Sequence, residues 1–94
     1  MSEFTHFSDD RELQIQLAKD LIGSFIGVRS AWIHEEEQKP APNSAQIATW
    51  RDEQGDFFDL RERLAMMNEG EIAEVFKKYR SQQEAESAVQ KNSR

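Results

Sequence analysis

The sequence predicts an all-α protein folded as a three-helix bundle, and three observations support this prediction. The helix formers Ala, Leu, Glu, Gln, Lys and Arg dominate the composition, whereas the strand formers Val and Thr are scarce. Apolar residues recur at helical spacing in three segments. Two short connectors rich in turn-forming residues separate these segments. We therefore expect helices over about residues 9–38, 44–67 and 69–84, in a single domain of residues 1–84.

The first predicted helix is the most apolar segment of the chain. Asp9 can cap its start, with Glu12 three residues later completing a capping box. At 100° per residue, the apolar side chains between Leu13 and Ile33 cover an arc of roughly 220°. An ordinary surface helix has an apolar stripe about half as wide. We therefore expect this helix to be central and to pack against neighbours on more than one side.

Two glycines four residues apart, Gly23 and Gly27, lie on the remaining face of this helix. A glycine inside a helix costs about 1 kcal/mol relative to alanine, so a compensating contact is expected at this notch. The simplest such contact is the close approach of another backbone. The neighbour is either a second helix of the same chain or another molecule, and the sequence leaves both open.

The second predicted helix follows a connector of residues 39–43 that contains two prolines. Proline disfavours helix in the residue before it and lacks a backbone donor, so the first helix is expected to end there. Asn43 or Ser44 can cap the second helix. Gly55 marks a point where this helix could kink or break, but the apolar pattern that continues across it favours one helix.

The third predicted helix begins at a turn in which Asn68 and Glu71 can form a capping box. Its apolar side chains form a narrow stripe at helical spacing, namely Ile72, Val75, Phe76 and Tyr79. The apolar pattern fades beyond Gln83. We therefore expect residues 85–94 to form a frayed or disordered C-terminal tail.

The composition and the motifs argue against an enzyme. The net charge of −6 opposes binding to nucleic acids or anionic lipids over the whole surface, and the chain has no cysteine for disulfide or thiolate chemistry. No Ser-His-Asp arrangement, phosphate-binding glycine loop or dinucleotide fingerprint is present. The longest uncharged apolar run, residues 21–28, is too short to cross a bilayer. We predict a cytoplasmic protein without catalytic activity, cofactor, metal ion or small-molecule substrate.

Two acidic clusters could carry chemistry, but each has a simpler interpretation. The first follows His34 at the end of the first helix and contains Glu35, Glu36 and Glu37. Acidic residues at a helix C-terminus oppose the macrodipole, and a plain solvated end or an acidic contact patch are the two interpretations. The second cluster comprises Asp52, Asp56 and Asp59 on the polar side of the second helix. Carboxylates catalyse only in a water-poor cleft, so we expect a solvated face.

Two further patterns are weaker. Glu3 and His6 have a spacing used by di-iron bundles, but no second copy exists and the pair precedes the predicted helix. Lys77, Lys78 and Arg80 form the main basic cluster of the chain. Glutamates flank this cluster and Tyr79 belongs to the apolar stripe, so a nucleic-acid site is not expected there.

The function class that remains after these interpretations is an interaction module. A third helix with so narrow a stripe leaves apolar surface uncovered, and such surface usually marks an interface. The expected function is therefore protein–protein contact or regulation, as a homodimer formed through the broad apolar face of the first helix. The residues expected at the partner are Leu21, Gly23, Phe25, Gly27, Trp32, Glu35, Glu36 and Glu37. The alternative is an acidic inhibitor, such as an immunity protein, antitoxin or DNA mimic, that presents carboxylates to a basic site.

Overall fold

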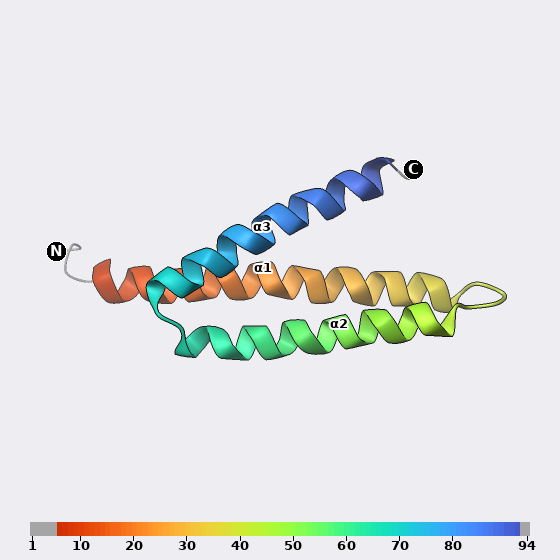
Figure 1. Ribbon diagram of the computed structural model, residues 1–94, viewed down its shortest axis with the longest axis horizontal. Helices are drawn as coiled ribbons and strands as arrows, with labels where there is room; N and C mark the ends of the chain where they lie inside the picture. Colours follow the sequence, from red (N-terminus) through yellow and green to blue (C-terminus); the bar gives the residue numbers. More distant parts are fainter. Residues whose placement is uncertain (1–5, 93–94) are drawn as a thin grey trace.

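A computed structural model describes the backbone of residues 6–92 and the side chains of residues 11–89. It contains three α-helices and no strand within the described residues (Figure 1). The helices are α1 (His6–Glu37), α2 (Ser44–Arg63) and α3 (Glu69–Asn92), and a 3-10 turn, η2 (Leu64–Met66), prolongs α2. The prediction of an all-α three-helix bundle is confirmed.

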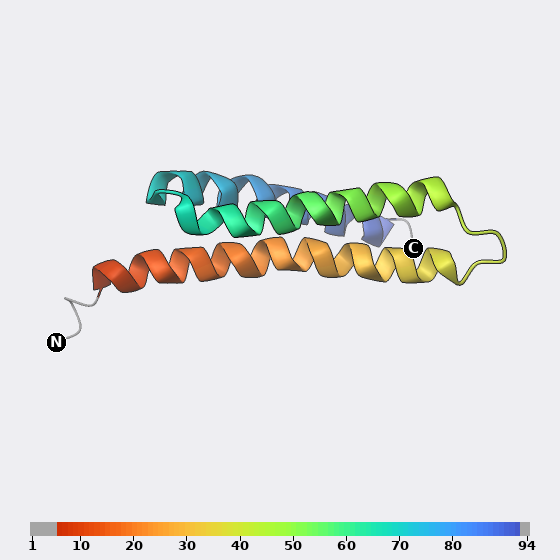
Figure 2. The ribbon, with the colours of Figure 1, turned by 90° about the horizontal axis from the view of Figure 1, so that it is seen from below.

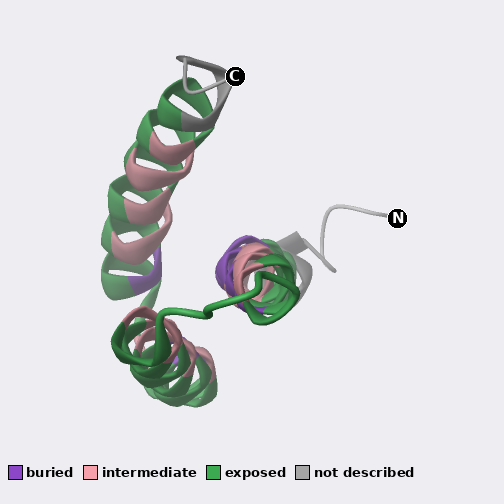
Figure 3. Ribbon diagram, turned by 90° about the vertical axis from the view of Figure 1, so that its right-hand side faces the viewer, coloured by how far each residue is buried: buried purple, intermediate pink, exposed green. Residues whose placement is uncertain are grey.

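The helices form an elongated bundle of 60 × 26 × 20 Å. α1 and α2 make an antiparallel hairpin that runs the length of the molecule (Figure 2). α3 begins beside the N-terminal part of α1 and diverges from the hairpin toward its own C-terminal end (Figure 1). In the view along the hairpin, α1 and α2 are seen nearly end-on, whereas α3 is inclined to both (Figure 3).

The core follows one face of α1, which packs against both other helices as the sequence predicts. The buried apolar side chains are Ala18, Leu21, Ile22, Phe25 and Ile33 of α1, Phe57 and Leu60 of α2, Leu64 of η2 and Ile72 of α3. Phe25 stacks on Phe57 with ring centroids 5.0 Å apart, and Tyr79 of α3 meets both rings edge-on. This aromatic trio joins all three helices at one point.

The connection between α1 and α2 is built by polar caps. The Asn43 side chain accepts a hydrogen bond of 3.0 Å from the backbone of Gln46, so Asn43 rather than Ser44 is the cap of α2. α2 then passes through Gly55 without a break, so the second helix is continuous, as the apolar pattern favours.

At the start of α3, the predicted capping box is confirmed. Glu71 N–H donates to Asn68 Oδ1 at 2.8 Å and Asn68 N–H donates to Glu71 Oε1 at 3.0 Å.

Both outer helix boundaries differ from the prediction. α1 begins at His6 rather than at Asp9, so the backbone at Asp9 is already helical, and the Asp9 side chain lies outside the described residues. α3 continues to Asn92, although the sequence predicts fraying from residue 85. The extension is held by polar contacts to α1, which an apolar pattern does not reveal. Glu3, Ser93 and Arg94 lie outside the described residues, as does the side chain of His6.

The glycine notch is not filled by a neighbouring backbone. A Cβ added at Gly23 would meet the flexible side chain of Arg61 at 3.7 Å, an ordinary contact. A Cβ at Gly27 would meet nothing within 4 Å among the described residues. The expected close approach within the chain is therefore wrong. α2 packs on a neighbouring strip of α1, where Gln54 Nε2 donates to the carbonyl oxygen of Ile26 at 2.8 Å.

Candidate functional site

The face predicted to bind a partner is partly occupied by the core of the protein itself. Leu21 and Phe25 are buried, with Phe25 only 1% exposed, so neither offers a surface to another molecule. Trp32 is half-buried and lies against Trp50, with ring centroids 5.5 Å apart. Leu21 and Phe25 must therefore be removed from the predicted partner surface. Their exposure could not be judged from sequence because the apolar arc does not show which part the neighbours cover.

Two of the three glutamates at the end of α1 have structural partners. Glu36 accepts hydrogen bonds from Lys39 Nζ at 2.9 Å and from the backbone N–H of Asn43 at 3.0 Å, which fixes the connection to α2. The hydrogen bond from Lys39, then that from Asn43, lowers the pKa of Glu36 below its ordinary value. Glu37 pairs with Arg51 at 3.1 Å, whereas Glu35 is exposed. Because Glu36 and Glu37 are paired within the chain, Glu35 is the member of the predicted acidic patch without such a partner among the described residues.

The most prominent exposed apolar side chains of α1 lie on its N-terminal half. Leu13 is 56% exposed and Leu17 is 46% exposed. Leu17 also lines a groove of about 290 Å³ between α1 and α3, which we call the α1–α3 groove. Its lining residues are Gln14, Leu17, Ile72, Ala73, Phe76 and Lys77. Gln14 Oε1 is buried there and accepts no hydrogen bond from the described residues.

Charged side chains surround this groove with different signs on its two helices. Lys77 lines the groove from α3, and the guanidinium of Arg80 lies 5.7 Å from the centre of the Phe76 ring. Asp20 stands on the α1 side, three residues after Leu17 and therefore on the same face of the helix. Lys77 is therefore the charged residue that lines the groove, and Asp20, which accepts a hydrogen bond of 2.9 Å from Gln16, lies outside its lining. The opposite charges of Lys77 and Asp20 are a property that a partner can recognise.

A charge cluster centred on the buried Arg29 lies farther along the bundle, where all three helices meet. Arg29 of α1 donates to Glu86 of α3 through two nitrogens, at 2.8 and 2.9 Å, and to Glu53 of α2 at 2.9 Å. We call these three residues the Arg29 cluster. The Arg29 side chain is only 6% exposed. Its guanidinium also lies 4.7 to 5.6 Å from the ring centres of Trp32, Phe57 and Phe25.

The electrostatics of the Arg29 cluster favour the charged forms. The hydrogen bond with Glu86 raises the pKa of Arg29 more than burial lowers it. Burial raises the pKa of Glu86, but the hydrogen bonds from Arg29 and Gln82, together with the charge of Arg29, lower it further, and the net shift is downward. Arg29 therefore stays positive and Glu86 stays negative at neutral pH. A buried arginine is tolerated only with such partners.

The sequence signal for this cluster was present but was interpreted differently. Arg29 directly follows the uncharged run of residues 21–28 and was not assigned to the core. Its spacing of four residues from both Phe25 and Ile33 nevertheless places it on the core face of the helix. A lone charge on an apolar helix face requires partners from elsewhere in the chain. Glu86 lies 57 residues away in sequence, so the pairing itself could not be deduced.

The remaining candidate residues do not assemble a reactive centre. No group of three or more His, Cys, Asp or Glu side chains is arranged to hold a metal ion in the part of the chain that was searched. His34 is exposed, as are the three aspartates of α2 and the basic residues Lys77, Lys78 and Arg80. All three aspartates are thus open to solvent, and of these only Asp56 also lines the cavity beside Arg29. Tyr79, by contrast, packs in the core.

Comparisons with known proteins gave no match to a family model, to a curated protein or to a solved structure. Among the described helices, none is both long enough and apolar enough to cross a membrane. The fold and the site together define a small acidic protein of three helices with an apolar groove and a charge cluster centred on a buried arginine.

Proposed function

We propose that this protein is an interaction module that forms a homodimer through the α1–α3 groove. The observation that carries the proposal is the exposure of Leu13 and Leu17 beside a groove lined mainly by apolar side chains. Large apolar side chains gathered at one surface usually mark an interface. The proposal keeps the first helix as the dimer surface but moves the contact from Leu21 and Phe25 to Leu13 and Leu17.

The charges around the groove favour a second copy of the chain as the partner. In a two-fold dimer whose axis runs along the groove, α1 of each copy faces α3 of the other. Asp20 of one copy then faces Lys77 of its partner, and this contact occurs twice. Opposite charges in such an arrangement favour association and fix its orientation.

The alternative function is an acidic inhibitor of a basic target. Asp52, Asp56 and Asp59 of α2 are exposed, and none of them takes part in an ion pair among the described residues. Such a row suits a basic partner protein. This alternative predicts a monomer whose binding to its target is weakened by salt and by changing the three aspartates to asparagine.

Sedimentation of matched variants tests the dimer. Leu17→Glu places a charge in the groove, and we expect it to convert the dimer to a monomer. Phe58→Glu is the control, because Phe58 is 52% exposed but lies on α2, away from the groove. Concentrations up to about 1 mM detect even an association of about 4 kcal/mol. A monomeric wild-type chain, or equal effects of the two substitutions in chains with unchanged helix content, would overturn the proposal.

A further inference from the structure

The side of α3 that faces the hairpin changes character halfway along the helix. In the first half, the residues packed against the core are apolar, and they end with Tyr79. In the second half, the half-buried positions are Gln82, Gln83 and Glu86. The apolar residues that remain there, Ala85, Ala88 and Val89, are exposed, and of these only Ala88 lines the space between α3 and α1. Apolar packing therefore holds α3 only as far as Tyr79.

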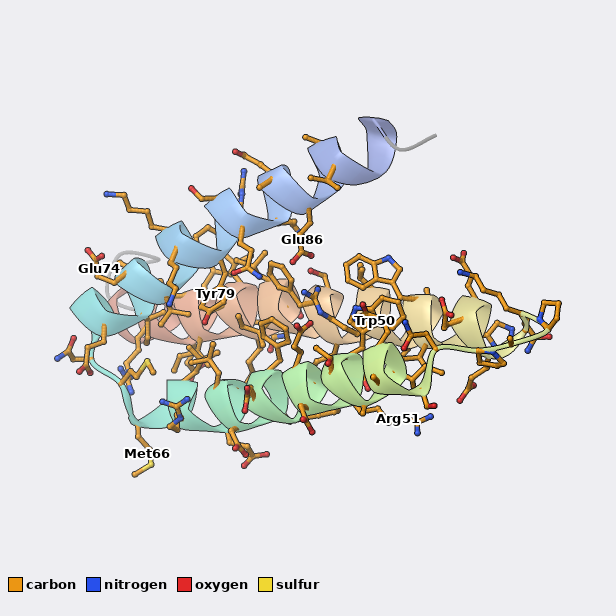
Figure 4. The ribbon with its side chains drawn as sticks, turned by 45° about the vertical axis from the view of Figure 1, so that its right-hand side comes forward. Trp50, Arg51, Met66, Glu74, Tyr79 and Glu86 are labelled. Carbon is orange, nitrogen blue, oxygen red and sulfur yellow. The ribbon has the colours of Figure 1, made fainter. Side chains whose placement is uncertain are left out.

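Beyond Tyr79, polar contacts connect α3 to α1. Gln83 Nε2 donates to Ser24 Oγ at 3.1 Å, and Glu86 accepts the two hydrogen bonds from Arg29. Glu86 points from α3 toward the hairpin, whereas Glu74 in the first half points away from it (Figure 4). α3 is already diverging from the hairpin at this level (Figure 1). The long side chain of Arg29 spans the widening gap.

Separation of this segment would not leave Arg29 without partners. Glu53 of α2 would still accept a hydrogen bond of 2.9 Å, and three aromatic rings would still surround the guanidinium. The Glu86 side chain is already 24% exposed, so its full return to water needs little rearrangement. An isolated buried charge would be far less tolerable. The hairpin can therefore stay folded when the end of α3 leaves.

We infer that residues 80–89 of α3 form a strap that opens and closes over α1 while the rest of the bundle stays folded. The ion pair between Arg29 and Glu86 holds the strap in its closed position. The strap covers a cavity of about 410 Å³ whose α1 wall consists of Ser24, Phe25 and Val28. Opening exposes to solvent the sides of Phe25 and Val28 that line this cavity. The strap is a property of the monomer and does not depend on the proposed dimer.

Hydrogen exchange measured by mass spectrometry on the full chain tests the strap. Glu86→Gln keeps the size of the side chain but removes its charge. Glu84→Gln is the control, because Glu84 is exposed and lines the same cavity but makes no hydrogen bond or ion pair among the described residues. We expect Glu86→Gln to speed exchange in residues 80–89 by about tenfold, while peptides of α1 and α2 exchange as before. Glu84→Gln should leave every peptide unchanged.

Three results would overturn the inference. The first is unchanged exchange in residues 80–89 of the Glu86→Gln protein. The second is faster exchange in all three helices, which would show that the segment opens only with the whole bundle. The third is an equal effect of Glu84→Gln, which would remove the role of the pair with Arg29. A circular dichroism spectrum of each variant establishes that the chain is folded before exchange begins.

Discussion

At the scale of single residues, Arg29 shows how a charge is accommodated inside a small apolar core. Its guanidinium makes hydrogen bonds to carboxylates from two other helices and lies near three aromatic rings. Replacing such a pair with apolar residues is often no less stable, so stability alone does not explain its presence. The geometry instead links the position of α3 to one side chain of α1.

The Glu86 carboxylate predicts a specific dependence of stability on pH. The pKa of Glu86 is lowered in the folded chain, so its contribution is present above the ordinary glutamate value of about 4.3 and is lost as the pH falls through the folded pKa. We expect the difference in Tm between the wild type and Glu86→Gln to be largest near neutral pH and to shrink below about pH 4.

Thermal melts of the two proteins between neutral and acidic pH provide the measurement. Glu53, Asp56, Arg63 and Tyr79 also face the cavity beside Arg29, but they are common to both chains and largely cancel in the difference. A difference in Tm that stayed constant across this range would contradict the account.

At the scale of elements, the sequence signals that begin and end helices are local, and they were largely sufficient to predict the three helices. The capping box of Asn68 and Glu71 needs only a three-residue spacing, and it is present as predicted. The far end of α3 was predicted poorly for the opposite reason. Gln83 and Glu86 resemble solvent-facing residues, and only the approach of α1 gives them their partners Ser24 and Arg29. Such a pairing depends on the tertiary fold.

The glycines of the helices permit a prediction at the same scale. A Cβ at Gly27 meets nothing within 4 Å among the described residues, so Gly27→Ala should raise the free energy of unfolding by about 0.5 to 1 kcal/mol. Gly55→Ala is a matched comparison, since its surroundings are equally open. Chemical denaturation measures both effects. Destabilisation by Gly27→Ala alone would show that the backbone at Gly27 is approached by another molecule.

At the scale of the whole molecule, the central question is where uncovered apolar surface lies. The sequence predicted a broad apolar first helix, but two of the eight residues assigned to the partner surface, Leu21 and Phe25, are covered by the chain itself. The reason is geometric, because Leu21 and Phe25 face Phe57 and Leu60 of α2 and Tyr79 of α3, whereas Leu13 and Leu17 lie at the edge of that core face. The angles at which the helices cross depend on side-chain packing among all three, which helical periodicity does not specify.

The proposed dimer makes its strongest prediction about charge. Asp20→Lys places two positive charges at each Asp20–Lys77 contact, and Lys77→Asp places two negative charges there. Each variant alone is therefore expected to be monomeric. When the two variants are mixed, both contacts regain opposite charges, so a mixed dimer should form. Lys78→Asp is the control for Lys77→Asp, because Lys78 is exposed but does not line the groove.

The molar mass of this mixture, measured by light scattering, tests the central claim most directly. The account predicts the chain mass of 10.9 kDa for each variant alone and twice that mass for the equimolar mixture. A mixture that keeps the mass of its separate components would contradict the proposed two-fold dimer.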